Sequence, residues 1–243
     1  MPNHVTHRIA ITGPKAKVDA FAATFLVEES DKNYQGETES WLTFDFNKLV
    51  PMPEIVKTSE SSSTVTIGLA LMDRGDVHTS FGYNTLDDML SWPWVIKEGI
   101  QDVEALRAHL MKMYPDAIEK AKVAIKCYEE TGHTDWYGWS IDNWGTKWGA
   151  YNVEFTRIDD TTLEIMFDTA WSVPEPVFVA LSNRAEVQGL TIKIVAFEEG
   201  WSFAYRGTMD DQGFIGEELE ATSELYEEVY GEKPCDDEED EDS

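Results

Sequence analysis

The chain has 243 residues, of which 42% are hydrophobic and nine are tryptophan, so it can bury a sizeable core. The chain has 19 basic and 47 acidic residues, and the formal net charge of -28 argues against direct binding to nucleic acid or to an anionic membrane. The apolar content excludes a largely disordered chain, and the longest charge-free apolar stretch, TVTIGLALM, is too short to span a bilayer.

The first predicted elements are a strand and a helix. Residues 4–11, HVTHRIAI, are rich in valine and isoleucine and predict a β-strand. A Gly-Pro turn leads into KAKVDAFAATFL, whose apolar residues recur at helical spacing. Residues 41–49, WLTFDFNKL, alternate between two faces and predict a second strand, which two prolines end. Together these segments predict a βαβ half.

The next segment has a different pattern, which predicts a mostly helical insertion at about residues 54–135. It opens with the loop sequence SESSS and later contains two runs with helical spacing on either side of a proline. The apolar positions of these runs are Val103, Leu106, Leu110 and Met113 in the first, and Ile118, Ala121, Ile125 and Tyr128 in the second.

The chain then returns to strands. YNVEFTRI and TLEIMFDTAW predict two strands, PEPVFVALSNRAEVQ predicts a helix, and LTIKIVAFE and WSFAYRG predict a closing hairpin. This order predicts an α+β fold: an antiparallel sheet of ferredoxin-like type with helices on one face. We expect one domain over residues 1–209, enlarged by the helical insertion.

An acidic helix is predicted over residues 210–231, followed by a disordered acidic tail at 232–243. One narrow apolar face repeats at spacings of four and three, and glutamates occupy the remaining positions. Such a row of carboxylates could bind a basic partner, whereas a solvated helix face would also explain it. The candidate partner-binding residues are Glu217, Glu218, Glu220, Glu224, Glu227 and Glu228.

The stretch GWSIDNWGTKWGAYN at residues 138–152 is the second candidate site. Its indole rings could stack on a ligand while nearby polar groups bind the edges of that ligand. Packing of the indoles in a core is favoured, because aromatic clusters more often belong to cores than to ligand sites. The candidate ligand-binding residues are Trp139, Asp142, Asn143, Trp144, Lys147 and Trp148.

Four phrases resemble the YubB ferredoxin-like family of phage and plasmid proteins. They are MPNHVTHRIAITG at the start, FDFNKLVPMPE at 44–54, DWYGWSIDNWGTKWGAYN at 135–152 and FDTAWSVPEPVF at 167–178. The resemblance runs from residue 1 to about 205 and implies a ferredoxin-like fold and a mobile-element origin. It implies no activity and no catalytic residues, and with the absence of a visible signal sequence it leads us to expect the bacterial cytoplasm.

Catalytic and metal sites find little support in the sequence. GxSxG, HExxH and CxxC motifs are absent, and Cys127 and Cys235 are far apart, so we expect neither an enzyme nor a disulfide. His4 and His7 would point to opposite faces of a strand, which argues against a metal site. Three acids beside aromatic residues, Asp45, Asp142 and Asp168, would form a catalytic pair only if the fold joined them. We expect no cofactor.

These observations favour a non-enzymatic interaction protein. The leading hypothesis is an acidic phage or plasmid protein that binds a basic surface of a host protein and mimics nucleic acid, inhibiting a defence or DNA-handling enzyme. The alternative is a small-molecule binding module or enzyme centred on the tryptophan-rich stretch at 139–148. A structural component of a virus particle is the third possibility.

Overall fold

The computed structural model describes residues 3–82 and 85–234 and contains two compact units. The sheet unit comprises residues 1–51 and 143–243, and the helical unit comprises residues 52–142. The helical unit is therefore an insertion in the chain of the sheet unit, where a helical insertion at about 54–135 is predicted from the sequence. Most of the acidic tail predicted at 232–243 lies outside the described residues, because these end at 234.

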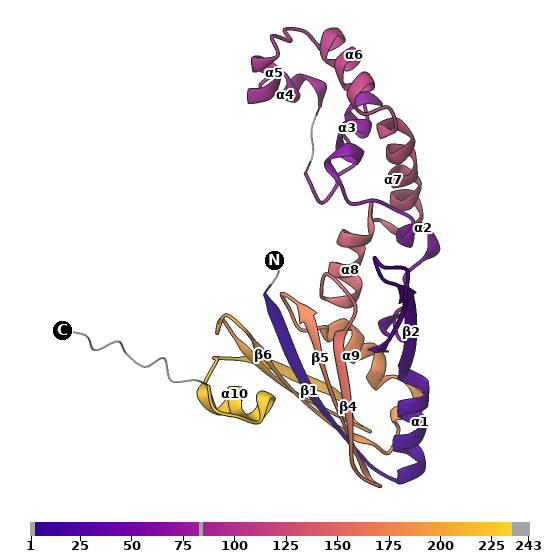
Figure 1. Cartoon of the computed structure of the whole chain (residues 1–243), viewed down its shortest axis with the longest axis vertical. Helices are drawn as coiled ribbons and strands as arrows, with labels where there is room; N and C mark the ends of the chain where they lie inside the picture. Colours follow the sequence, from indigo (N-terminus) through magenta and orange to yellow (C-terminus); the bar gives the residue numbers. More distant parts are fainter. Residues whose placement is uncertain (1–2, 83–84, 235–243) are drawn as a thin grey trace, which may run out of the picture. The chain divides into compact units, whose positions relative to one another are not determined.

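The sheet unit contains a six-stranded sheet and a separate two-stranded hairpin among the described residues (Figure 1). The strands of the large sheet are β1 (His4–Thr12), β4 (Tyr151–Asp159), β5 (Thr162–Ala170), β6 (Thr191–Glu198), β7 (Ala204–Asp210) and β8 (Gly213–Leu219). The hairpin strands are β2 (Leu26–Lys32) and β3 (Thr38–Phe44). The helical segments of this unit are α1 (Lys15–Phe25), η1 (Phe46–Lys48), α9 (Glu175–Ser182), η2 (Ala185–Val187) and α10 (Ser223–Tyr230).

The large sheet confirms the predicted α+β fold with an antiparallel sheet. Its strand order is β4-β5-β1-β6-β7-β8, and every neighbouring pair is antiparallel. Taken along the chain, β1, α1, β4, β5, α9 and β6 form the βαββαβ arrangement of a ferredoxin-like domain. The strands β7 and β8 extend this sheet beyond β6, and the chain between α1 and β4 holds the hairpin and the helical unit.

The core lies on the face of the sheet that α1 and α9 cover. The alternation of β1 buries its odd-numbered residues from Val5 to Ile11, and phenylalanines of both helices are also fully buried. Each buried valine, isoleucine or phenylalanine side chain contributes about 2 kcal/mol. The helix α10 lies on the opposite face, where Leu225 and Val229 pack against Val195 and Phe197 of β6 (Figure 1).

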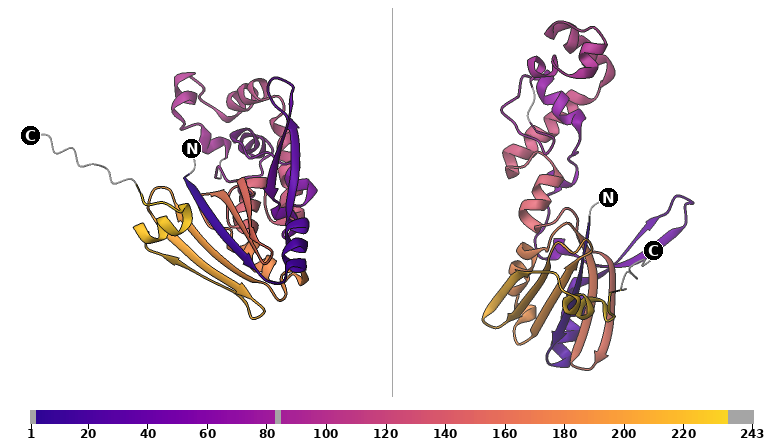
Figure 2. Two further views of the ribbon diagram at one scale, coloured as in Figure 1. Left: turned by 60° about the horizontal axis from the view of Figure 1, so that its bottom comes forward. Right: turned by 90° about the vertical axis from the view of Figure 1, so that its left-hand side faces the viewer.

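The predicted βαβ half is wrong, because the strand after α1 does not join the large sheet. Residues 38–44 pair with β2 instead, and the chain after Phe44 turns at Asp45, whose carboxylate accepts a hydrogen bond from the Asn47 amide at 2.9 Å. The sequence of β2, LVEESDK, is exposed over most of its length, so it lacks the apolar alternation that reveals a half-buried strand. The β2–β3 ribbon extends away from the large sheet (Figure 2).

The helix predicted over 210–231 is wrong in its first half, where residues 213–219 form the edge strand β8. The chain reverses at Gly213, which has φ +117°, and Gly216 then lies opposite Gly207 in register. A Cβ at Gly216 would lie 1.7 Å from the Tyr205 hydroxyl, so a larger residue here would displace the Tyr205 side chain. An acidic helix is present, but it begins only after the N-cap Thr222 and ends before Gly231.

The helical unit is built around α3, α6 and α7. Its helices are α2 (Glu54–Lys57), α3 (Ser63–Leu71), α4 (Leu86–Met89), α5 (Pro93–Lys97), α6 (Val103–Met113), α7 (Ala117–Thr131) and the greater part of α8 (Trp136–Trp144). The helices α6 and α7 occupy the two runs of helical spacing predicted from the sequence, and Gly132 with φ +80° ends α7. Within residues 3–82 and 85–234, no helix is long and apolar enough to cross a membrane.

Candidate functional site

The C-terminal glutamates are exposed, but they do not form one helical row. Glu217 and Glu218 lie on β8, so their side chains point to opposite faces of the sheet. Glu217 is in register with Arg206 on the face that carries α10, whereas Glu218 is in register with Tyr205, whose hydroxyl donates to Glu175 of α9. Glu220 is exposed in the connection between β8 and α10.

The helix α10 holds three of these acids on one side. Glu224, Glu227 and Glu228 are exposed, while Leu225 and Val229 on the opposite side are buried against the sheet. The carboxylate of Glu228 is ion-paired with Arg206. We call Glu217, Glu224, Glu227 and Glu228 the acidic face; it is held by packing and by the N-cap bond from the Leu225 amide to Thr222 at 3.3 Å.

A cavity of about 600 Å³ lies on the open face of the sheet beside α10. Arg8, Lys193 and Arg206 line it together with Glu227 and Glu228. Both arginines make contacts within the protein. Arg8 forms an ion pair with Glu164 at 2.9 Å and donates a hydrogen bond to the Glu228 carbonyl at 3.1 Å. Arg206 forms an ion pair with the Glu228 carboxylate. The cavity is therefore of mixed charge. Its two arginines connect the C-terminal turn of α10 to the sheet through their contacts with Glu228.

The β2–β3 hairpin carries a second group of exposed carboxylates. These are Glu28, Glu29, Asp31, Glu37 and Glu39. Lys32 is the basic residue of the hairpin, and Tyr34 near the turn is 94% exposed. The hairpin and the acidic face both belong to the sheet unit, so this unit presents negative charge from two places in the chain.

The six candidate ligand-binding residues are divided between the two compact units. Trp139 and Asp142 belong to the helical unit, where Trp139 is buried and Asp142 lies 3.8 Å from the His133 ring nitrogen. The other four belong to the sheet unit. Asn143 is half-buried at the end of α8, and the buried Trp144 donates from Nε1 to the Val50 carbonyl at 2.9 Å.

Lys147 and Trp148 lie beside each other on the surface of the sheet unit. The Lys147 ammonium is 4.5 Å from the Trp148 ring centroid and 4.8 Å from that of Trp171, a cation–π arrangement. Trp148 remains 38% exposed. In this stretch, Trp139 and Trp144 are therefore buried packing residues, as favoured from the sequence, while Trp148 is available to a ligand.

Trp144 and Trp148 line an aromatic cleft of about 420 Å³ in the sheet unit. The remaining lining residues come from β2, β3, η1 and the start of β4, and they are Glu29, Thr43, Phe44, Asp45, Phe46, Asn47, Gly149, Ala150 and Tyr151. The rings of Trp148 and Tyr151 lie 6.2 Å apart at 75°. Tyr151 lies within the tryptophan-rich stretch but was not among the candidate residues. The stretch alone does not reveal Glu29, because β2, β3 and the start of β4 meet only in the fold.

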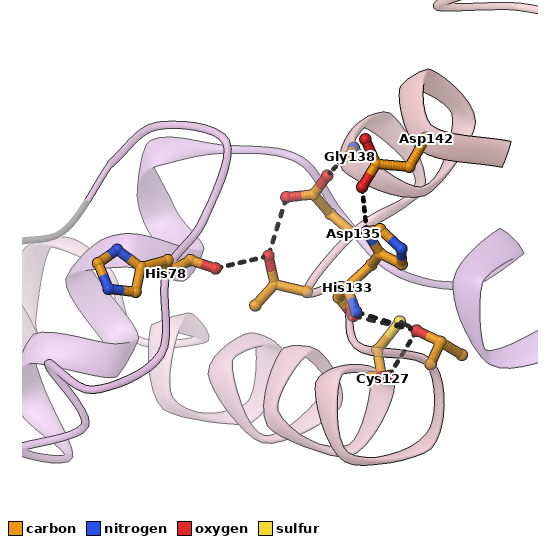
Figure 3. Close-up of polar contacts among 8 residues, drawn as sticks. His78, Cys127, His133, Asp135, Gly138 and Asp142 are labelled. Atoms are coloured by element: carbon orange, nitrogen blue, oxygen red, sulfur yellow. Dashed lines mark hydrogen bonds and ion pairs between the residues drawn. The ribbon is translucent and has the colours of Figure 1, made fainter. Parts of the chain in front are cut away.

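A network of polar groups in the helical unit closes the turn between α7 and α8 (Figure 3). The buried Asp135 accepts hydrogen bonds from the Ser80 hydroxyl at 2.8 Å and from the Gly138 amide at 3.0 Å. The imidazole of His78 points away from the other side chains drawn, and the His78 carbonyl accepts a hydrogen bond from the Thr134 hydroxyl at 3.2 Å. Burial raises the pKa of the Cys127 thiol, so this thiol stays protonated at neutral pH.

The residues of this network have structural roles, and two of the three acids considered as catalytic partners, Asp45 and Asp168, also make structural hydrogen bonds. Asp45 holds η1, and Asp168 accepts from the Thr6 hydroxyl and the Asn152 amide, both at 2.8 Å. Asp142 belongs to the other unit. Within the part of the chain that the structure describes, no group of three or more histidine, cysteine and acidic residues could hold a metal ion.

The comparisons with known proteins concern the fold. Residues 150–204 match the family model described as a ferredoxin-like domain in Api92-like protein. No curated protein matches the sequence. Among solved structures, the crystal structure of protein api92 from Yersinia pseudotuberculosis is similar, with 11% sequence identity, a TM-score of 0.42, and coverage of 91% of this chain and 99% of that chain. The segment 150–204, which spans β4 to the start of β7, is thus similar to the ferredoxin-like domain of Api92-like proteins.

Proposed function

We propose that this protein is a non-enzymatic interaction protein whose acidic face binds a basic surface of another protein. The observation that carries the proposal is the position of Glu217, Glu224 and Glu227, which are exposed on a strand and a helix that packing holds against the sheet. Because this backbone is already ordered, binding costs little backbone entropy, and the exposed carboxylates attract a basic partner over about 8 Å at physiological salt.

The finer proposal is mimicry of nucleic acid on behalf of a mobile element. A nucleic-acid-handling enzyme carries a basic groove for phosphates, and ordered carboxylates can occupy such a groove. The resemblance to phage and plasmid proteins of the YubB family supports a host enzyme as the target. A short DNA duplex should then displace the partner from the protein, whereas co-binding of DNA and protein to that partner would contradict mimicry.

The partner-binding proposal is tested by capture from a bacterial lysate on three immobilised proteins. These are the wild type, the triple variant Glu217→Gln, Glu224→Gln, Glu227→Gln, and a control with three exposed acids of the helical unit replaced, Glu98→Gln, Glu104→Gln, Glu129→Gln. Both variants change the net charge equally. We expect a basic protein to be retained by the wild type and the control but not by the triple variant. Equal retention by all three would contradict a role for the acidic face.

A ligand-binding module is the second candidate, favoured by the aromatic cleft beside Trp144 and Trp148. A small ligand in this cleft should change the fluorescence of Trp148 and raise the unfolding temperature. The Gln substitutions in the acidic face should leave both effects unchanged, because none of these residues lines the cleft. Weakened ligand binding in the triple variant would argue against an independent site.

A further inference from the structure

The aromatic cleft combines ring faces with negative charge. Trp148 and Tyr151 form two walls at 75° to each other, and the acidic residues Glu29 and Asp45 also line the cleft. Among the described residues that line the cleft there is no lysine, arginine or histidine. Aromatic faces and carboxylates both attract cations, so the lining selects for a positively charged group.

The walls of the cleft are held in place before any ligand arrives. The Tyr151 hydroxyl lies 2.8 Å from Nδ1 of His4 and donates to the Thr169 carbonyl at 3.2 Å. Phe44 and Phe46, at the base of the hairpin, pack edge to face at 5.7 Å and are almost fully buried. A cleft with fixed walls loses little conformational entropy on binding.

Two further observations agree with a cationic occupant. Trp148 already accepts the Lys147 ammonium over its ring, at 4.5 Å, and yet keeps 38% of its surface exposed. Burial is the main cause that raises the pKa of Tyr151 to about 12, and the negative charges of the nearby Asp168 and Glu199 carboxylates add to it. Lys147 itself is not one of the lining residues.

We propose that the aromatic cleft receives an arginine side chain of the basic partner. This inference rests on the proposed function and names a second point of contact in the same unit. The planar guanidinium of arginine can stack on Trp148 while its N–H groups donate to Glu29, which the compact ammonium of lysine cannot do equally well. A volume of about 420 Å³ admits a single long side chain.

The probe is N-acetyl-arginine methylamide, with the uncharged N-acetyl-citrulline methylamide as the matched ligand. Binding is followed by NMR through the indole N–H signals. We expect the arginine compound to shift the Trp148 signal and the citrulline compound to bind at least about fivefold more weakly. Equal binding of the two compounds would overturn the inference. Stronger binding of tetramethylammonium than of the arginine compound would also overturn it, in favour of a free ammonium ligand.

The hairpin offers matched variants for the same titration. Glu29→Gln should weaken binding of the arginine compound about fivefold, while Glu28→Gln should not, because adjacent strand residues point to opposite faces and Glu28 does not line the cleft. Trp148→Ala should abolish binding of the arginine compound, which is then followed through the indole N–H signal of Trp144, the second tryptophan of the cleft. Trp201→Ala removes an exposed tryptophan that does not line the cleft, and it should leave binding unchanged. Equal effects of Glu28→Gln and Glu29→Gln would overturn the assignment.

Failure of the cleft and failure of the proposed function give different results. If the arginine compound does not bind but the partner is still lost from the acidic-face triple variant, the cleft inference is wrong and the proposed function stands. If the arginine compound binds but the triple variant retains the partner, the acidic face is not the docking surface. Retention of the partner by Glu29→Gln and Trp148→Ala at wild-type affinity would exclude the cleft from partner binding.

Discussion

His7 is a titratable residue enclosed by the core of the sheet. Its side chain is fully buried and stacks on Phe167 at a centroid distance of 4.6 Å. Neither ring nitrogen has a hydrogen-bond partner within the described residues. Burial lowers the pKa of His7 to about 3, because the apolar surroundings disfavour the imidazolium. The folded protein therefore holds this histidine neutral at physiological pH.

This burial makes the stability depend on pH. The folded His7 stays neutral down to pH about 3, whereas the unfolded chain takes up the proton near pH 6.5, so the unfolded state binds more protons between these values. Above pH 6.5 His7 is neutral in both states, so it does not lower the free energy of unfolding. Below pH 6.5 the free energy of unfolding should fall by about 1.4 kcal/mol per pH unit. Urea unfolding of the wild type and of His7→Phe between about pH 7 and pH 5 measures the difference, about 2 kcal/mol.

The substitution to phenylalanine keeps a ring against Phe167 and removes the proton-binding nitrogens, so its unfolding free energy should show a smaller pH slope. His7→Leu serves as a second variant if the larger ring disturbs the core. The same slope in the wild type and both variants would show that His7 does not titrate on unfolding in this range.

Single residues were predictable from the sequence where strand alternation determines their surroundings. The prediction that His4 and His7 point to opposite faces is confirmed: His7 is buried in the core, while His4 contacts Tyr151. Trp144 and Trp148 of the cleft were among the candidate residues, but Glu29 was not predictable, because it is far from them in the sequence. They meet through the fold, where the Thr43 hydroxyl of β3 donates to the Ala150 carbonyl at 3.3 Å.

Among the elements, α3 and α7 make a close helix–helix contact at Gly68. A Cβ at this position would lie 2.0 Å from the Ala117 carbonyl oxygen, which is backbone and cannot rotate away. Gly68→Ala should therefore force the helices apart and lower the free energy of unfolding by about 1–3 kcal/mol. Gly138→Ala in α8 is the matched control, since its Cβ meets nothing nearer than 3.7 Å, and it should stabilise by about 0.5–1 kcal/mol. Thermal unfolding that ranks the two variants in the reverse order would contradict this packing.

The helix α10 depends on its N-cap at Thr222. Thr222→Ala removes the acceptor for the Leu225 amide and should cost about 1 kcal/mol of helix stability. Hydrogen exchange of the α10 amides should then become about fivefold faster. Thr38→Ala in the exposed hairpin should leave these rates unchanged. Unchanged exchange in Thr222→Ala would mean that packing alone holds the acidic face.

Several elements with a regular apolar spacing were predicted, whereas β2 was missed and β8 was misread as helix. The hairpin of β6 and β7 and the helices α6 and α7 follow the apolar spacing of their sequences. The strand β2 is exposed over most of its length, so its polar sequence carries no strand pattern. The glutamates in residues 213–219 favour a helix locally. These residues form a strand instead, because β8 pairs with β7.

At the scale of the whole molecule, the net charge of -28 opposes folding by self-repulsion. Salt screens this repulsion, so the unfolding temperature should rise by about 2–5 °C between about 0.05 and about 0.5 M sodium chloride. Differential scanning calorimetry measures the shift. A lower unfolding temperature at high salt would show that ion pairs such as that of Arg8 with Glu164 outweigh the repulsion.

The fold class was predictable because the succession of strands and helices restricts the possible sheets. The order of strands in the sheet was not, since the pairing of β1 with β5 joins segments about 160 residues apart and depends on tertiary contacts. The global charge was evident in the sequence, but its arrangement was not: the predicted single row of glutamates is divided between β8 and α10.

The most direct test of the acidic face is the affinity for the captured basic partner as a function of salt. We expect the wild type and the control triple variant to bind tightly at about 0.05 M salt and to weaken steeply towards about 0.5 M. Replacement of Glu217, Glu224 and Glu227 by Gln should weaken binding about tenfold at low salt and reduce the salt dependence. Equal affinity and equal salt dependence in all three proteins would contradict the account.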